Sequence, residues 1–409
     1  MNAERKRTLG VVGAQAIAQL SVIAVIPLIT RQYVAEEVGW YQLATAIAMT
    51  LLPLATLRVE FAIPSMQYGV NVRTLMRSGL GVTFGLSAGL VAAALIASAA
   101  KAEASAAVLA MTGLLVAGLS WTAIDNARLI RLDQTRPLAL RNLSAGVIAA
   151  VLQIVAVLVA ADVVFLAAAI LIARLIAMSF TRGRRRLDAN SVGIEKSPYT
   201  FKRGSRSVLS GLVATATGQV LVFGTGLGYG AAASAYVGLA QRAAGTPLTL
   251  LGQGLAQAMQ GRVAPLIREG RYGLVQHIRQ QVLWLSLLSS LTAVVLIVLA
   301  PILAVPLLGE GWQMVGTITA ILAIPLSFQL LVGPLMTILP MLAREGLLLV
   351  IQIARLTLVV GAVVGGMLAG ADLVQVSIVY GIATVIGYVA MLLVVFGVAG
   401  AHDRRYAGP

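Results

Sequence analysis

Three arginines lie inside long apolar stretches of this sequence: Arg174, Arg242 and Arg355. A charged side chain at the centre of a membrane-spanning helix costs about 2.5–3.5 kcal/mol on insertion scales, so each arginine needs a partner or a function. A guanidinium group stays protonated and donates paired hydrogen bonds, which suits it to phosphate-like anions in a partly desolvated cavity. These arginines are therefore the first candidates for a binding site.

Two of these arginines also have structural explanations. Arg174 lies eight residues before Arg182, about 12 Å along a helix, so its side chain could extend towards the membrane surface. Arg355 lies eleven residues after Arg344, about 16 Å along a helix, which places it near the membrane midplane. For Arg355, hydrogen bonds between helices and contact with a substrate are both open.

Residues for covalent chemistry and metal binding are scarce. The sequence has no cysteine and two histidines, His277 and His402. This excludes disulfide bonds, thiolate zinc sites, cysteine nucleophiles and a histidine-based metal cluster. A P-loop for ATP is also absent from the sequence. We therefore predict no catalytic residue, no metal site and no cofactor.

The elements that carry the arginines must be transmembrane helices. Of the 409 residues, 59% are hydrophobic and 11% charged, whereas soluble domains carry about a quarter charged residues. Apolar stretches of about 20 residues predict an all-α polytopic membrane protein with about twelve transmembrane helices. The stretches are 9–30, 38–57, 75–98, 105–124, 139–160, 163–181, 207–228, 234–257, 282–305, 313–335, 346–369 and 373–398.

The charge distribution predicts the orientation. With both termini in the cytoplasm, most basic residues fall in the termini or the inner connections. The outer connections then hold only Arg31 and Lys101 as basic residues, against Glu36, Glu37, Glu103, Asp162, Glu310 and Asp372. This asymmetry follows the positive-inside rule. The net charge of +15 therefore indicates topology and attraction to anionic inner-leaflet lipids, with no nucleic acid as a partner.

The connections define the predicted domains. No outer connection is long enough for a catalytic domain, whereas the inner connections 58–74, 125–138, 181–206 and 258–281 read as amphipathic segments on the membrane surface. We predict an N-terminal six-helix bundle (1–181), a basic cytoplasmic linker (182–206), a C-terminal six-helix bundle (207–400) and a cytoplasmic tail (401–409).

The two predicted bundles are related by an internal repeat. A shift of 196 residues brings Tyr33, Ala35, Trp40, Leu43 and Ala44 onto Tyr229, Ala231, Tyr236, Leu239 and Ala240. Six spans separate the copies, so both have the same orientation. A parallel repeat is typical of transporters with two bundles around a pseudo-two-fold axis along the membrane normal, with a cavity between them.

Several short motifs resemble the oligosaccharide flippases of bacterial polysaccharide export, in the multidrug/oligosaccharidyl-lipid/polysaccharide (MOP) superfamily. In the first half the motifs are Pro27-Leu28-Ile29-Thr30-Arg31, Glu36-Glu37-Val38-Gly39-Trp40-Tyr41 and Leu57-Arg58-Val59-Glu60-Phe61-Ala62-Ile63-Pro64. In the second half they are Tyr236-Val237-Gly238-Leu239-Ala240-Gln241-Arg242, Pro247-Leu248, Leu251-Gly252-Gln253, Leu308-Gly309-Glu310-Gly311-Trp312 and Gly333-Pro334-Leu335. The motifs run in order along nearly the whole chain, although the last two spans of fourteen-span members have no counterpart.

The resemblance implies a function in polysaccharide biosynthesis, such as the export of O-antigen, lipopolysaccharide or exopolysaccharide. A flippase of this family moves a polyprenyl-pyrophosphate-linked oligosaccharide from the inner to the outer leaflet by alternating access through a central cavity that is often cationic. It also implies a multi-pass protein of the bacterial inner membrane. Polysaccharide polymerase and glycosyltransferases are the further partners expected.

The expected substrate-binding residues are Arg31, Arg242, Arg355, Arg174, Gln15, Gln19 and Thr217. Arg242 and Arg31 belong to family-like motifs, although Arg31 could also be an interface anchor. The glutamines share one helix face with Thr30, and Thr217 shares another with Ser207 and Ser210. Such polar faces could bind sugars or form hydrogen bonds between helices.

Two other functions compete with flipping. A membrane polymerase or glycosyltransferase would need acid, base or metal-binding groups on the outer face, where the acidic residues are isolated except for Glu36-Glu37. A cation-coupled drug exporter would need a carboxylate deep within a span, and the sequence predicts none. Arg58 and Glu60, at the inner end of the second span, could form a salt bridge or couple transport to an ion.

Overall fold

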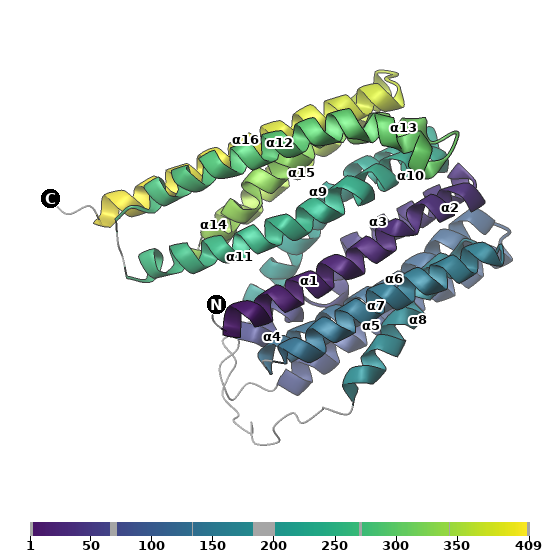
Figure 1. The fold of residues 1–409 in the computed structure, drawn as a ribbon, viewed down its shortest axis with the longest axis horizontal. Helices are drawn as coiled ribbons and strands as arrows, with labels where there is room; N and C mark the ends of the chain where they lie inside the picture. The colour runs from purple at the N-terminus through teal and green to yellow at the C-terminus, as the bar shows by residue number, and fades with distance from the viewer. Residues whose placement is uncertain are drawn as a thin grey trace. The chain divides into compact units, whose positions relative to one another are not determined.

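The computed structural model describes residues 3–65, 72–132, 134–182, 201–269, 272–342 and 344–406, and regular structure in these residues is helical (Figure 1). The N-terminal half contains α1 (Ala3–Ala24), α2 (Ile26–Gln32), α3 (Ala35–Ala55), α4 (Val59–Ser65), α5 (Val72–Ala99), α6 (Glu103–Arg131), α7 (Thr135–Leu158) and α8 (Val164–Arg182). The C-terminal half contains α9 (Phe201–Tyr229), α10 (Ala231–Ala240), the π-helix η1 (Gln241–Gly245), α11 (Thr246–Arg268), α12 (Leu274–Leu308), α13 (Gln313–Val332), the 3₁₀-helix η2 (Pro334–Thr337), α14 (Ile338–Met341), α15 (Glu345–Leu368) and α16 (Leu373–Tyr406).

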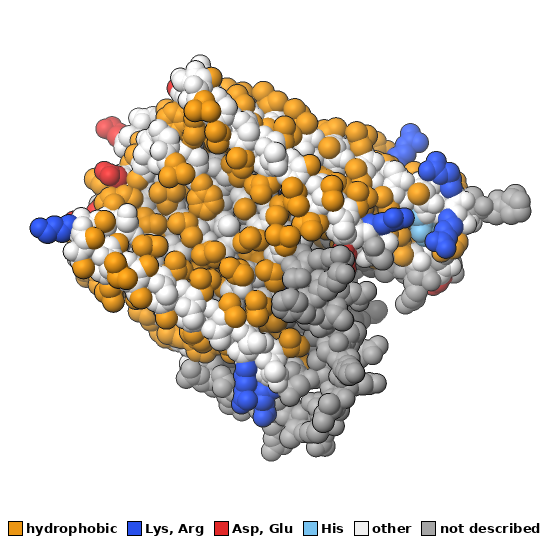
Figure 2. Space-filling model, turned by 180° about the vertical axis from the view of Figure 1, so that it is seen from behind, with side chains coloured by type: hydrophobic (Ala, Val, Ile, Leu, Met, Phe, Trp, Pro, Cys, Tyr) orange, Lys and Arg blue, Asp and Glu red, His pale blue; other side chains and the backbone are white. Residues whose placement is uncertain are grey.

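These helices confirm the all-α polytopic membrane fold. Among the described residues, 10 helical segments are long and apolar enough to cross a membrane, and Val164–Phe180 is a shorter apolar helix. The predicted span 234–257 corresponds to α10, η1 and α11 in succession. Figure 2 shows hydrophobic side chains over most of the visible face, with the coloured Lys and Arg side chains towards its margins. An apolar surface of this extent fits a lipid environment.

The chain forms two compact units. The N-terminal unit comprises Met1–Gly226 and Gly230–Ala235, and the C-terminal unit comprises Leu227–Tyr229 and Tyr236–Pro409. Most of α9 therefore belongs to the N-terminal unit. The predicted linker 182–206 falls largely on residues 183–200, which lie outside the described residues.

The internal repeat has a direct structural counterpart. α3 begins at Ala35 and α10 begins at Ala231, which reproduces the predicted offset of 196 residues. The tyrosine two residues before each of these helices makes the same contact in both halves. The Tyr33 hydroxyl donates to the carbonyl of Ala161 at 2.9 Å, between α7 and α8, and the Tyr229 hydroxyl donates to the carbonyl of Ala371 between α15 and α16. The two halves therefore share local structure as well as helix order.

In the N-terminal unit, α5 packs on α6, α3 packs on α6, and both α1 and α8 pack on α7. The contact between α1 and α7 is close because Gly146 faces Ala18. A Cβ atom at Gly146 would lie 2.5 Å from the Cβ of Ala18, so a larger residue would force the helices apart. Small residues at such contacts are typical of membrane helix pairs, which associate through close packing.

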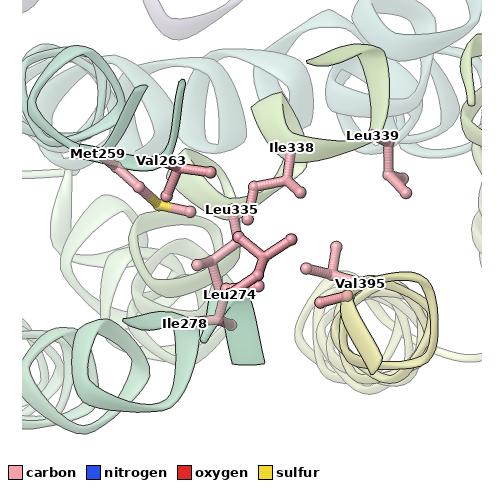
Figure 3. Close-up of a cluster of buried hydrophobic side chains, with 9 residues drawn as sticks. Met259, Val263, Leu274, Ile278, Leu335, Ile338, Leu339 and Val395 are labelled. Atoms are coloured by element: carbon pink, nitrogen blue, oxygen red, sulfur yellow. The ribbon is translucent and has the colours of Figure 1, made fainter. Parts of the chain in front are cut away.

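In the C-terminal unit, a buried apolar cluster joins four helices and η2 (Figure 3). Its residues are Met259 and Val263 of α11, Leu274 and Ile278 of α12, Leu335 of η2, Ile338 and Leu339 of α14, and Val395 and Ala399 of α16. The cluster includes the N-terminal part of α12 and the C-terminal part of α16. It therefore joins the N-terminal end of α12 to the C-terminal end of α16, and the charge distribution predicts that both ends face the cytoplasm.

Two of the predicted inner connections are mostly helical. Segment 125–138 is largely helical, because α6 continues to Arg131 and α7 begins at Thr135. No glycine or proline interrupts residues 119–136, so nothing stops the helix after its apolar part. Segment 258–281 is likewise mostly the end of α11 and the start of α12. Charged residues assigned to loops therefore lie on helices, and some of them are buried.

Candidate functional site

A buried ionic cluster joins α6 and α7 in the N-terminal unit. The Asp125 carboxylate accepts a hydrogen bond from Nη1 of Arg128 at 3.0 Å, one turn along α6. It also accepts one from Nη1 of Arg141 on α7. The exposed fractions of Asp125, Arg128 and Arg141 are 7%, 5% and 1%. The stability of a fully buried ion pair depends on good geometry and on complete hydrogen bonding, because both charges have lost their water.

This cluster has more guanidinium donors than acceptors. Nε and Nη2 of Arg128 and Nε of Arg141 are buried and have no hydrogen-bond acceptor among the described residues. Nη2 of Arg141 donates to the side-chain oxygen of Asn142 at 3.3 Å. Donors left without acceptors in a buried site favour an additional anionic or polar group.

Arg174 extends the positive charge along the unit. A Cβ atom on Gly118 would lie 3.2 Å from the Arg174 Cδ, so the arginine of α8 lies directly against α6. The charge of Arg141 acts repulsively on Arg174. Further along, Nε2 of Gln153 donates to the Tyr41 hydroxyl at 3.4 Å and to the Leu166 carbonyl at 3.2 Å. The interior of this unit thus carries a series of polar groups that includes three arginines and one carboxylate.

The burial of Asp125, Arg128 and Arg141 was not predicted from the sequence. Asp125 and Arg128 fall in the predicted inner connection 125–138, and Arg141 lies near the start of the predicted span 139–160. Asp125 and Arg128 stand three residues apart in a stretch without glycine or proline. Opposite charges at this spacing can pair on a helix, and that was the available signal.

Arg355 bridges two helices of the C-terminal unit. Its guanidinium carbon lies 4.5 Å from the centroid of the Tyr388 ring on α16, and its Nη1 contacts the Met391 sulfur at 3.6 Å. Gly387 makes this approach possible, since a Cβ there would come within 2.6 Å of the Arg355 Cγ. The helix-bridging explanation for Arg355 is thus observed, while contact with a substrate stays a prediction.

Arg242 lies in η1, the π-helical turn that joins α10 to α11. Pro247 is the second residue after η1. In a regular α-helix its ring would clash with the carbonyl four residues earlier, that of Ala243. The wider π turn accommodates that clash. Single π turns within helices are frequent at functional sites. Arg242 itself is partly buried in the C-terminal unit.

The remaining predicted site residues lie in the N-terminal unit. Arg31 is exposed at the end of α2, and Gln15 and Gln19 are partly buried on α1. Thr217 is buried on α9, where its hydroxyl donates to the carbonyl of Val213 at 2.7 Å. Arg174 belongs to this unit as well, whereas Arg242 and Arg355 belong to the other. A common binding site for all seven residues stays a prediction.

Glu60 lies just beyond a strained break between α3 and α4. Leu57 and Arg58 adopt left-handed backbone angles, with φ of 52° and 56°, which are unfavourable for side chains of this size. The Arg58 guanidinium lies 4.2 Å from the centroid of the Phe61 ring. Burial raises the pKa of Glu60, and the positive charge of Arg58 opposes this only in part.

Comparison with known proteins gives one family match. Residues 70–317 match the family described as polysaccharide biosynthesis protein. The search of curated proteins finds no match.

Solved structures show the same fold at low sequence identity. An inward-facing multidrug resistance MATE family transporter of the MOP superfamily has 13% identity, 96% coverage of both chains and a TM-score of 0.65. The lipid II flippase MurJ, in an inward closed conformation, has 10% identity, coverage of 95% of this chain and 87% of that chain, and a TM-score of 0.63. A MOP superfamily transporter from Pyrococcus furiosus, described as having a binding pocket of reversed polarity, has 14% identity, coverage of 98% and 97%, and a TM-score of 0.56.

Proposed function

This chain belongs to the polysaccharide biosynthesis protein family, and from that premise we propose that it is a flippase for lipid-linked oligosaccharides. It moves polyprenyl-pyrophosphate-linked units from the inner to the outer leaflet by alternating access. The family match carries this proposal. The similar folds support it, because they are those of transporters and of a flippase. In this role the protein makes and breaks no covalent bond.

The buried arginines support an anionic substrate. For Arg174, Arg242 and Arg355, a pyrophosphate group offers oxygen atoms in a geometry that guanidinium groups pair with well. Exposed Arg31 adds a further positive charge. Gln15, Gln19 and Thr217 supply hydrogen-bonding groups for sugars. The lipid tail can stay in the bilayer, so only the head group needs protein contacts.

The proposal includes a location and partners. The protein lies in the inner membrane of a bacterium with both termini in the cytoplasm, where anionic lipids attract its basic inner segments. Glycosyltransferases supply the completed unit on the inner face, and a polymerase uses it on the outer face. The exported glycan is an O-antigen, lipopolysaccharide or exopolysaccharide chain.

Drug export is the second candidate, favoured by the likeness to a multidrug resistance transporter. Asp125 supplies the buried carboxylate that the sequence did not reveal. Both of its oxygens, however, already accept hydrogen bonds from arginines. A carboxylate compensated in this way is a poor site for a cationic drug or a coupling ion, so we favour flipping.

A deletion strain tests the proposed function. Without the flippase, completed lipid-linked units should accumulate on the inner leaflet. A glycosidase added outside intact spheroplasts should then be unable to reach them. Unpolymerised units on the outer leaflet would instead place the protein after flipping. Unchanged glycan with increased sensitivity to cationic dyes would support the exporter.

The variant Arg242→Gln, expressed in the deletion strain, tests the role of this arginine in transport. Arg242→Gln should abolish complementation while the membrane abundance of the protein stays near normal, because the change removes a charge and keeps a polar side chain of similar length. Arg344→Gln, at an exposed arginine between α14 and α15, is the matched control and should complement fully. Full export by Arg242→Gln would show that Arg242 is not part of the binding site.

A further inference from the structure

A small groove between α12 and α13 combines hydroxyl groups with apolar side chains. Its volume is about 170 Å³, and it lies within the C-terminal unit. The α12 side carries Ser286, Ser289, Ser290 and Ala293, and the α13 side carries Ile324, Ser327, Phe328 and Leu331. The sequence analysis gave these serines no role, and the proposed flippase function does not use them.

Two of the serines are buried without a hydrogen-bond partner. Ser289 and Ser327 are 6% and 4% exposed, and within the described residues neither Oγ atom has a donor or acceptor in reach. Other hydroxyls on the same helices are satisfied by their own backbone. The Thr292 hydroxyl donates to the Leu288 carbonyl at 2.8 Å, and the Thr319 hydroxyl donates to the Val315 carbonyl at 2.7 Å. Buried polar groups are nearly always paired, so the two serine hydroxyls indicate a bound polar group.

The groove adjoins apolar surface. Leu283 and Leu287, on the α12 turns beside the serines, are 65% and 72% exposed, and Ile324 on α13 is 48% exposed. Large exposed aliphatic side chains on a membrane-spanning helix face acyl chains. The occupant of the groove must therefore offer oxygen atoms and a hydrocarbon chain in one molecule.

A positive charge lies on the same face of α12. Arg279 is exposed and precedes Ser286 by seven residues, about 10 Å along the helix and about 20° around its axis. It precedes the buried Ser289 by ten residues, about 15 Å along the helix and about 80° around its axis. Arginine pairs well with phosphate. Going along this face, a ligand would meet a cation, then hydroxyl groups, then aliphatic and aromatic side chains.

We propose that this groove binds one anionic glycerophospholipid from the leaflet at the N-terminal end of α12. Arg279 pairs with the lipid phosphate. The hydroxyls of Ser289 and Ser327 donate to the ester carbonyl oxygens of the glycerol backbone. Phe328 and Leu331 contact the first part of an acyl chain. The site is a defined position for one lipid, distinct from the general attraction of basic loops to anionic lipids, and it does not depend on the transported substrate.

Native mass spectrometry of the purified full-length protein tests this site. The protein is titrated with dioleoylphosphatidylglycerol, and the dissociation constant of the first retained lipid is measured. Ser289→Ala with Ser327→Ala should weaken binding about fivefold or more, since two hydrogen bonds are lost. Arg279→Gln should weaken it by a similar factor and reduce the preference over dioleoylphosphatidylcholine.

Matched controls separate the site from general effects. Thr292→Val removes a hydroxyl of α12 that is already bonded within the helix, and Arg404→Gln removes an exposed arginine of α16; neither should change binding. Glycerol 3-phosphate at millimolar concentration should not compete. Equal affinities for all variants, or displacement by glycerol 3-phosphate, would overturn the proposal. If the double serine variant unfolds, the lipid affinity of Arg279→Gln alone tests the site. The Arg279 side chain is exposed, so its replacement leaves the packing intact.

Discussion

Asp125 is the carboxylate of the buried ionic cluster in the N-terminal unit. A carboxylate between two buried guanidinium groups, on α6 and α7, joins these helices at the end that the charge distribution places in the cytoplasm. Breaking a buried ion pair by removing one partner leaves an uncompensated charge, which costs more than replacing the whole group by apolar residues. Asp125 is therefore first a structural residue, whatever the arginines also bind.

Asp125→Asn should strongly destabilise the protein, by about 3–5 kcal/mol, because Arg128 and Arg141 lose their counter-charge. Replacing all three residues by leucine should be less harmful than the single change, since no buried charge then remains. Thermal unfolding of both variants in detergent, monitored by tryptophan fluorescence, shows which of the two is less stable. A single variant as stable as the wild type would show that the pair contributes nothing to the fold.

Glu60 makes stability depend on pH. Burial raises its pKa above the ordinary value of 4.5, so between these two values the folded state binds more protons than the unfolded state. Stability due to this group must then fall as the pH rises from 4.5 through the folded-state pKa, and stay constant above it. Relative to the wild type, Glu60→Gln should gain stability over that interval. Melting temperatures of both proteins from pH 4 to pH 8 measure this, and a constant difference would contradict it.

Charged residues that interrupt an apolar stretch can be identified from the sequence, whereas buried charged residues at or beyond the ends of a stretch cannot. Arg174 and Arg355 could be predicted because each stands alone among aliphatic residues. The burial of Asp125 could not be predicted, since hydropathy ends a span where charged residues begin, whereas a helix continues until its hydrogen bonds are interrupted. Arg141 lies within the predicted span 139–160, but only two residues from its start. The burial of both residues depends on contacts between α6 and α7 that local sequence does not encode.

At the scale of elements, close helix contacts depend on single glycines. Gly146→Leu should strongly reduce the folded amount of protein in membranes, because even a Cβ at this position of α7 would meet Ala18 of α1 at 2.5 Å. Gly89→Leu on α5 is the control, since nothing lies within 4 Å of a Cβ there. Fluorescence-detected size-exclusion chromatography of tagged variants compares them. Equal monodisperse peaks would show that α1 and α7 can separate without loss of the fold.

Helix existence was predictable, while helix ends were not. Apolar length alone predicts α5, α12, α15 and α16, whose exposed faces carry large hydrophobic side chains. The π turn at Gln241–Gly245 and the left-handed break at Leu57 and Arg58 are set by local sterics and packing. These irregular elements fall in segments with family-like motifs, where local strain often accompanies function.

At the scale of the whole molecule, the repeat relates connections of the two halves that the charge distribution predicts to lie outside. In each half a tyrosine before the second span donates to a carbonyl between the fifth and sixth spans. A local carboxylate supports each connection: Asp162 accepts from the backbone N–H of Val164 at 2.9 Å, and Asp372 accepts from the backbone N–H of Gln375 at 2.7 Å. Two of the acids predicted to lie outside, Asp162 and Asp372, thus have structural roles at helix starts.

Two other connections, those between α5 and α6 and between α14 and α15, test the orientation of the chain. Positive charge is retained on the cytoplasmic side during insertion, so the turn between α5 and α6 should face outwards and the turn between α14 and α15 inwards. The protein has no cysteine, so Lys101→Cys and Arg344→Cys each introduce a single thiol. In intact cells an impermeant maleimide should label the cysteine at position 101 and reach the one at 344 only after permeabilisation. The predicted linker 182–206 should behave like position 344. Labelling of the cysteine at position 344 from outside would show that the true topology is the reverse of the predicted one. The direction of the proposed transport would then also be reversed.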